Sequence, residues 1–190
     1  MLRERVLCVD DDNNLLEAIR RTSGQEFALT LARGGEDGMR AIDHDGPFAV
    51  IVSDLRMPVI DGISLLHHAA TVAPDTVRIL LTGNADLEHS LLAVNEGRIF
   101  RFLTKPCPAS QLKQAIHAGI EQHRLVANQR ILLEQTVRGC IRALSEVISL
   151  VHPTVGARTA RVRRLVVELG EATHAPDLWR IEVAALLAHL

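Results

Sequence analysis

Several features are scarce or missing in this sequence of 190 residues. It contains no run of about 18 apolar residues, the length that a membrane-spanning helix requires. Its amino terminus lacks the longer apolar segment and the small-residue cleavage site of a secretory signal. The formal net charge is only −2, so the overall balance does not indicate an anionic partner. We therefore expect a cytoplasmic chain that makes no membrane contact and no direct contact with nucleic acid.

Cysteine is also scarce. The three cysteines, Cys8, Cys107 and Cys140, are scattered along the chain and odd in number. They form neither a CxxC pair nor the spacing of a metal site. This pattern does not indicate a disulfide framework, and it fits a reducing compartment.

Short apolar runs are plentiful in the first part of the chain. They occupy residues 5–10, 27–32, 48–54, 76–83 and 98–104. Between them, apolar residues recur at helical spacing within residues 15–19, 38–42, 63–69 and 87–94. This alternation predicts an α/β fold with a five-stranded parallel sheet that carries helices on both faces. The third and fourth runs are almost continuously apolar, which favours central strands, whereas the mixed second run favours an edge strand.

A long helix is predicted over residues 109–151, where proline is absent and glycine occurs only at Gly119 and Gly139. The alternating four- and three-residue spacing of a coiled-coil seam is followed by Leu133, Val137, Cys140, Leu144, Val147 and Val151. The same phase extends toward the amino terminus through Leu112, Ile116, Gly119 and Val126, with His123 and Arg130 as interruptions. The helix could serve as a linker that packs on its own domain, or its second half could form a parallel dimer. We favour a homodimer through residues 126–151, because this half has no other obvious partner in the chain.

Polar residues stand where four of the predicted strands end. They are Asp10, Asp11 and Asp12 after the first strand, Asp54 after the third, Thr82 after the fourth and Lys105 after the fifth. In an open parallel sheet these ends form the ligand-binding edge. Clustered carboxylates repel each other unless a cation joins them, and oxygen ligands favour Mg²⁺. An aspartate in such a place can act as a nucleophile that forms an aspartyl-phosphate.

Four segments carry a family resemblance. VLCVDDDNNLL, VSDLRMPVIDG, ILLTGNAD and RFLTKP occur in this order, each with an apolar run, and together they resemble the response-regulator receiver family over about residues 1–125. The resemblance implies a flavodoxin-like sheet with strand order 2-1-3-4-5. It also implies that Asp54 accepts a phosphoryl group from a histidine kinase.

The resemblance further implies roles for individual residues. Asp10 and Asp11 form the acidic pair, and Mg²⁺ is bound by Asp10, Asp11, Asp54 and the carbonyl of Arg56. Thr82 and Lys105 contact the phosphoryl group, and the bond from Lys105 to Pro106 is cis. Phe102 occupies the aromatic switch position, while Arg56 and Asn84 tune hydrolysis of the phospho-aspartate.

Residues 152–190 are predicted to be all-α. Two stretches, ALSEVISLVHPTVGARTARVRRLVVELG and WRIEVAALLAHL, resemble the start of an HD-type (HD-GYP-like) phosphohydrolase domain. Arg158 stands where that family has a histidine, and Ala188 and His189 stand where it has a His-Asp pair. Arginine cannot bind a metal, and His189 is one residue out of register, a rotation of about 100° on a helix. We therefore expect a degenerate HD-like output, truncated because the chain stops inside an apolar helix.

Four functional hypotheses remain open at this point. The leading one is a signalling switch in a two-component phosphorelay, with receiver phosphorylation as its only chemistry. The alternative is a regulated cyclic-di-GMP phosphodiesterase with catalytic residues beyond Leu190. A phosphate sink without an active output is also possible. A transcription factor is disfavoured, since no helix-turn-helix is evident and Arg158, Arg161 and Arg164 fit a solvated helix face.

Overall fold

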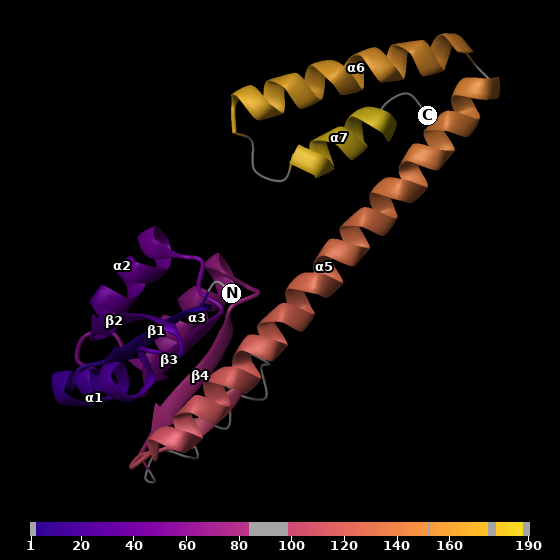
Figure 1. Ribbon diagram of the computed structural model, residues 1–190. Helices are drawn as coiled ribbons and strands as arrows, with labels where there is room; N and C mark the ends of the chain where they lie inside the picture. Colours follow the sequence, from indigo (N-terminus) through magenta and orange to yellow (C-terminus); the bar gives the residue numbers. More distant parts are fainter. Residues whose placement is uncertain (1–2, 84–98, 152, 175–177, 188–190) are drawn as a thin grey trace. The chain divides into compact units, whose positions relative to one another are not determined.

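The computed structural model describes residues 3–83, 99–151, 153–174 and 178–187, and the chain divides into two compact units (Figure 1). The first unit comprises residues 1–127 and the second residues 128–190. The long helix α5 (Ala109–Val151) begins in the first unit and ends in the second. The helix predicted around residues 87–94 lies outside the described residues.

The first unit contains a five-stranded parallel sheet in the order β2-β1-β3-β4-β5. Its strands are β1 (Arg5–Asp10), β2 (Ala28–Arg33), β3 (Val50–Asp54), β4 (Val77–Thr82) and β5 (Arg101–Thr104). Every residue of β3 is buried, whereas most of β2 is only partly buried. The predicted flavodoxin-like fold is confirmed, including the central position of the third strand and the edge position of the second.

The strand register brings the carboxyl ends together. In the pairing of β1 with β3, Val9 stands opposite Ser53, so Asp10 and Asp54 follow on adjacent strands. On the far side of β3, Asp54 pairs with Leu81 of β4. The polar residues at the strand ends therefore lie along one edge of the sheet, as expected for a parallel arrangement.

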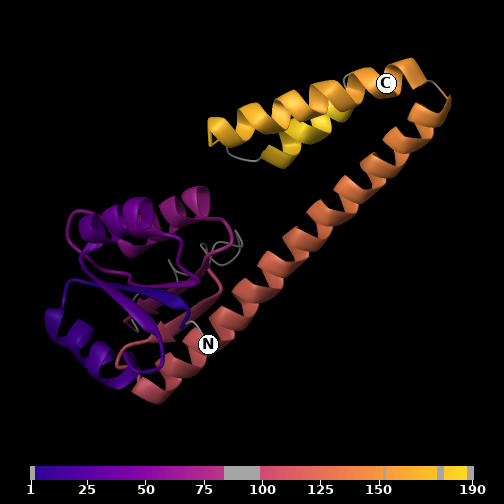
Figure 2. The same ribbon diagram turned by 45° about the horizontal axis from the view of Figure 1, so that its top comes forward.

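Apolar side chains on the two faces of the sheet form separate clusters. On one face, α1 (Asn13–Ser23) and the first turns of α5 pack against side chains of β1, β3 and β4. On the other face, α2 (Gly35–Asp45) and α3 (Gly62–Val72) pack against the alternate residues of the same strands. Figures 1 and 2 show α1 on the opposite side of the sheet from α2 and α3. The central strands are apolar on both faces because both are covered.

The second unit consists of the remainder of α5 with α6 (Pro153–Ala172) and α7 (Leu178–Leu187). The last two helices form a hairpin in which Thr159 and Ala185 are buried. A Cβ atom at Gly170 would lie 2.0 Å from Leu178 Cδ1, so glycine permits this close approach. Arg163 Nε donates to Glu182 Oε1 at 2.7 Å across the hairpin. The long helix and the helical carboxyl-terminal segment thus agree with the predicted fold class.

Among the residues that the structure describes, no helix has both the length and the apolar character needed to cross a membrane.

Candidate functional site

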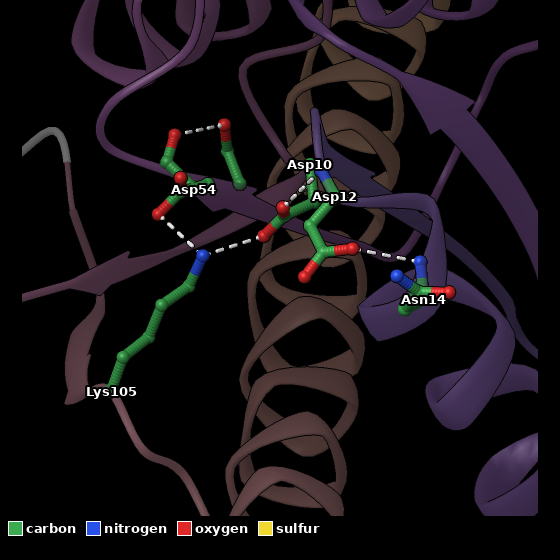
Figure 3. A network of polar contacts seen from close by, with 6 residues as sticks. Asp10, Asp12, Asn14, Asp54 and Lys105 are labelled. Atoms are coloured by element: carbon green, nitrogen blue, oxygen red, sulfur yellow. Dashed lines mark hydrogen bonds and ion pairs between the residues drawn. The ribbon is translucent and has the colours of Figure 1, made fainter.

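A lysine joins two buried carboxylates at the carboxyl edge of the sheet (Figure 3). The ammonium nitrogen of Lys105 lies 2.7 Å from Asp10 Oδ2 and 2.9 Å from Asp54 Oδ1. Asp10 and Asp54 are both buried, whereas the Lys105 side chain is about one-third exposed. Asp10 and Lys105 are therefore in direct contact, although 95 positions separate them in the sequence. The contact arises because parallel strands place their carboxyl ends side by side.

The three aspartates after β1 have different environments. Asp10 accepts the backbone N–H of Asp12 at 2.9 Å through Oδ1, so both of its oxygens have donors. The Asp12 side chain instead caps α1 and accepts the N–H of Asn14 at 2.8 Å. Figure 3 shows Asp12 directed toward Asn14, whereas Asp10 is directed toward Lys105. Aspartate is a preferred N-cap residue, so Asp12 has a structural role that Asp10 does not share.

Asp10, Asp11 and Asp54 form a cluster that could hold a metal ion. Each residue offers a carboxylate oxygen, and these oxygens lie within 4.8 Å of one another. Asp11 is exposed, while the other two are buried. Lys105 offsets only one of the three negative charges, so the cluster retains an excess that a divalent cation would neutralise. An all-oxygen donor set open to solvent on one side fits Mg²⁺, which keeps several waters and accepts phosphate oxygens.

Burial and charge affect the proton affinities of the site in opposite directions. Burial raises the pKa of the Asp54 carboxyl, the charge of Asp10 raises it further, and the hydrogen bond from Lys105 opposes the rise. Burial alone would lower the pKa of Lys105, but its hydrogen bonds to Asp10 and Asp54 outweigh burial and raise it. Lys105 is therefore held as a cation between the two carboxylates.

Thr82 lies at the same edge of the sheet, but its side chain is on the opposite face from that of Asp54. It is fully buried, and its Oγ1 donates to the carbonyl oxygen of Gly83 at 3.1 Å. By strand alternation Thr82 belongs with Leu80, which packs toward α2 and α3, whereas Asp54 belongs with Val52, which packs toward α1 and α5. The hydroxyl must therefore rotate before it can donate to a group on Asp54.

The remaining predicted residues surround the site. Arg56 is exposed in the loop after β3. Phe102 is partly buried on β5, pairs with Leu80 and packs against the apolar cluster beneath α2 and α3. The peptide bond from Lys105 to Pro106 is cis, as expected. Asn84 lies outside the described residues.

Sequence reasoning missed two residues that position the backbone of Asp54. Ser53 is fully buried, and its Oγ donates to the Asp54 carbonyl oxygen at 2.9 Å. Gly62 begins α3, and a Cβ atom there would lie 2.0 Å from the same oxygen. The Gly62 N–H also donates to the carbonyl of Leu55 at 2.9 Å. The Asp-Gly pair before a helical pattern was the available signal for Gly62, whereas no local pattern marks Ser53.

An apolar cavity of about 250 Å³ lies beside Lys105. Its walls come from α1, from the turn after β5 and from the start of α5, and they include Leu15, Ile19, Pro106, Cys107 and Leu112. The charged residues Asp10, Asp54 and Lys105 therefore lie next to an apolar cavity on the side of the sheet that α1 and α5 cover.

Residues 6–117 match the family described as the response regulator receiver domain. The chain belongs to this family. The match covers the described sheet except for Arg5 at the start of β1, and it includes the aspartates at the end of β1, Asp54 at the end of β3 and Lys105 after β5. The receiver domain thus accounts for most of the first compact unit.

Curated relatives of the receiver extend the comparison. The hydrogenase transcriptional regulatory protein HoxA of Cupriavidus necator is 33% identical over 120 residues, which cover 63% of this chain and 25% of that protein. The C4-dicarboxylate transport transcriptional regulatory protein DctD of Pseudomonas aeruginosa is 33% identical over 169 residues, which cover 87% of this chain and 34% of that protein. The chain therefore spans about a quarter to a third of the length of these relatives.

Solved structures show the same fold. A structure described as adenylate cyclase from Rhodopirellula baltica is 43% identical, with a TM-score of 0.68, and the match covers 70% of this chain and 98% of that one. The signal receiver domain of an HD domain-containing protein from Pseudomonas fluorescens Pf-5 is 28% identical, with a TM-score of 0.62, and the match covers 67% of this chain and 94% of that one.

Two expectations gain no support from these relatives. Both curated relatives are named as transcriptional regulators, so the predicted degenerate HD-type output is not supported. The likeness to the protein from Pseudomonas fluorescens concerns its signal receiver domain. The expected absence of nucleic-acid contact is likewise unsupported, since the relative NtrC of Proteus hauseri is named a DNA-binding transcriptional regulator. Both expectations were drawn from net charge and apolar pattern, which carry information on solubility and fold. The output and its nucleic-acid contacts depend instead on local surfaces and sites, which these patterns do not specify.

Proposed function

We propose that this chain is the receiver and linker part of a cytoplasmic two-component response regulator that accepts a phosphoryl group on Asp54. The observation that carries the proposal is the Lys105 ammonium held between the buried carboxylates of Asp10 and Asp54. A fixed positive charge beside a buried carboxylate neutralises the incoming phosphoryl oxygens and leaves the carboxylate free to attack phosphorus.

The donor in this proposal is a phosphohistidine of a partner kinase. An Asp54 carboxylate oxygen attacks phosphorus in line, and the phosphorus–nitrogen bond of the donor breaks as the new phosphorus–oxygen bond forms. Mg²⁺, held by Asp10, Asp11, Asp54 and the Arg56 carbonyl, would supply additional positive charge. Lys105 remains beside the product oxygens, and the apolar cavity next to it can receive an apolar side chain of the donor.

The switch in this proposal starts from the position of Thr82. Its hydroxyl turns from the Gly83 carbonyl to a phosphoryl oxygen, and the partly buried Phe102 moves into the space that this releases. Asn84 and Arg56 would set how quickly the phospho-aspartate is hydrolysed. Because α5 begins only four residues after Lys105, a displacement of β5 is transmitted directly to the long helix.

Output in this proposal passes through α5 as a homodimer over residues 126–151. Leu133, Leu144 and Val147 occupy the predicted seam and are more than half exposed in the single chain. A seam of this spacing is stabilised when a second helix of the same phase covers it. The names of the curated relatives favour a regulator of transcription as the whole protein.

The hydrolase alternative is the weaker candidate. Within the described residues, the group of three or more side chains that could hold a metal ion is Asp10, Asp11 and Asp54, which belongs to the receiver. The described part of α6 and α7 therefore offers no metal-binding set of that size. A phosphodiesterase would require ligands from residues outside this chain or outside its described part.

The deciding experiment is intact-mass measurement after treatment with Mg²⁺ and acetyl phosphate. We expect a phosphoryl adduct on the native chain and none on Asp54→Asn. Asp12→Asn is the matched control, because it makes the same carboxylate-to-amide change nearby while asparagine still caps α1. We expect this control to keep the adduct. A native chain that takes up no phosphoryl group contradicts the proposal.

A further inference from the structure

A buried hydroxyl group lies next to Asp54 in the sequence but on the other face of the sheet. Ser53 precedes Asp54 on β3 and is fully buried, and successive side chains of a strand point to opposite faces. Ser53 stands level with Val9 of β1 and Leu80 of β4, which both belong to the apolar cluster beneath α2 and α3. The residues that flank Ser53 on the two adjacent strands are therefore apolar.

The packing of this apolar layer does not need a hydroxyl group. A hydroxyl buried among apolar side chains costs free energy unless it forms a hydrogen bond. Ser53 Oγ forms such a bond by donating to the carbonyl oxygen of Asp54 at 2.9 Å. The net gain in stability from one such bond is small, because the same groups bind water in the unfolded chain. Alanine is nearly the same size and would fit the layer, so packing alone does not explain the serine.

The peptide group that joins Asp54 to Leu55 is held on both of its polar sides. Its carbonyl accepts the Ser53 hydroxyl, and its N–H donates to the carbonyl oxygen of Leu81 on β4 at 2.9 Å. A Cβ atom at Gly62 would lie 2.0 Å from the same carbonyl oxygen, so the start of α3 lies directly against it. The Ser53 hydroxyl and the backbone of α3 thus restrict the same oxygen atom.

The orientation of the Asp54 side chain is coupled to this peptide group. Both are attached to the Asp54 Cα atom, and the carboxylate contacts Lys105 Nζ at 2.9 Å. Figure 3 shows the carboxylate directed toward Lys105. A rotation of the peptide group would change the direction of the carboxylate relative to the loop that begins at Leu55. The hydrogen bond from Ser53 opposes that rotation, because Ser53 is itself fixed in the buried layer.

We propose that Ser53 is a positioning residue for phosphoryl transfer to Asp54. Its hydroxyl holds the Asp54–Leu55 peptide group, and this peptide group holds the carboxylate in the direction from which it attacks phosphorus. The inference rests on the proposed function and adds a residue that touches neither the donor nor the transferred group. Reaction rates depend steeply on the alignment of the reacting groups, so loss of the hydroxyl should slow transfer in a chain that is still folded.

Ser53→Ala in the full chain tests the inference. The rate of adduct formation is followed by intact mass with acetyl phosphate and saturating Mg²⁺. We expect this rate to fall by about fivefold, the factor that corresponds to one hydrogen bond of typical strength. Ser53→Thr keeps the hydroxyl and should react faster than Ser53→Ala. A Ser53→Thr chain that is as stable as Ser53→Ala but reacts no faster contradicts the inference.

Thr76→Val is the matched control. Thr76 is buried just before β4, at the opposite edge of the sheet from Asp54, and its Oγ1 donates to the carbonyl oxygen of Phe48 at 2.7 Å. The control therefore also removes a buried hydroxyl that donates to a backbone carbonyl. We expect it to lower the midpoint of thermal unfolding at least as much as Ser53→Ala does. Its phosphorylation rate should change by less than about twofold, because distant sites act independently.

Hydrogen exchange examines the peptide group without any phosphoryl transfer. The Leu55 N–H donates to Leu81, so its exchange rate reports how often this peptide group leaves its bonded position. We expect Ser53→Ala to accelerate exchange of the Leu55 amide, and Thr76→Val to leave it unchanged. Unchanged exchange in Ser53→Ala would show that the hydroxyl does not hold the peptide group.

The outcomes separate this inference from the proposed function. If the native chain takes up no phosphoryl group, the proposed function is wrong. If the native chain reacts and a folded Ser53→Ala chain reacts at the same rate, the proposed function stands and the positioning role is wrong. If Ser53→Ala and Thr76→Val slow the reaction equally, the effect follows from stability, and the positioning role is again wrong.

Discussion

The two compact units differ in how far their apolar side chains are buried. In the first unit, Leu7, Leu65, Ile79 and Ile116 have essentially no exposed surface, since helices cover both faces of the sheet. Among the described residues of the second unit, Ala185 is the one buried hydrophobic residue, while ten large hydrophobic side chains from Ile131 to Ile181 are exposed. The first unit therefore buries most of its apolar core within itself. The described helices of the second unit leave apolar side chains exposed, although a helix gains most of its stability from packing an apolar face.

The largest expected effect is loss of a core side chain from the first unit. Leu65→Ala removes a fully buried side chain of α3 that packs in the apolar cluster against the sheet, and we expect the free energy of unfolding of this unit to fall by about 2–5 kcal/mol. Leu132→Ala makes the same change at an exposed position of the second unit. We expect it to change the free energy of unfolding of that unit by less than about 0.5 kcal/mol. Urea unfolding followed by circular dichroism measures both. Equal losses would contradict the contrast between the two units.

Two glycines sharpen the same comparison. A Cβ atom at Gly62 would collide with the Asp54 carbonyl oxygen, so we expect Gly62→Ala to destabilise the first unit by about 1–3 kcal/mol and to slow phosphorylation of Asp54. A Cβ atom at Gly139 meets nothing within 4 Å, so Gly139→Ala should stabilise α5 by about 0.5–1 kcal/mol. Thermal unfolding and the rate of adduct formation are the measurements. A neutral Gly62→Ala would show that the backbone beside Asp54 is more tolerant than the structure indicates.

Protein concentration should affect the two units differently. If the second unit is completed by a second copy, its stability should rise by about 1.4 kcal/mol of dimer for each tenfold rise in concentration. The sequence contains a single tryptophan, Trp179 on α7, so its fluorescence reports on the second unit alone. Hydrogen exchange of the backbone amides in β1 and β3, which report on the first unit, should show no such dependence. An unfolding midpoint, followed by Trp179 fluorescence, that does not change with protein concentration would contradict dimerisation through the second unit.

The smallest expected effect concerns acid and the attachment of α5 to the receiver. The hydrogen bond from His117 and then that from Lys113 hold the pKa of Glu26 below its usual value. A depressed carboxyl pKa stabilises the fold above the unfolded-state value of about 4.3, and the contribution disappears as pH falls through the lower folded value. We expect Glu26→Gln to reduce the loss of stability of the first unit on acidification. Urea titrations at a series of pH values measure this, and unchanged acid sensitivity would contradict it.

Most of the receiver could be predicted from local pattern. The apolar runs identify all five strands, because a strand buried on both faces needs continuous apolar side chains. Asp10, Asp54 and Lys105 could be placed together before any contact was known, since parallel strands bring their carboxyl ends to one edge. The pattern could not tell that Asp12 is a helix cap whereas Asp10 contacts Lys105, because both follow the same strand and differ only in direction.

The output was predicted less well for a physical reason. An apolar spacing of three and four residues specifies a helix and its buried side, but many unrelated helical domains share it. The resemblance to an HD-type domain rested largely on such spacing, and the curated relatives do not support it. Ser53 was missed because its role depends on a carbonyl oxygen whose position is set by the start of α3.

The sequence alone determined the elements of this protein: five parallel strands, the acidic and basic residues at their ends, and a long helix, for which the apolar spacing predicts a coiled-coil seam. These features depend on residues that are near in sequence or on the general geometry of parallel sheets. The tertiary structure decided the rest. It set the 2.7 Å and 2.9 Å contacts of Lys105, the orientation of Thr82 away from Asp54, and the exposure of the apolar faces at the end of α5 and on α6. Such contacts join residues that are distant in sequence, and only packing determines which of them meet.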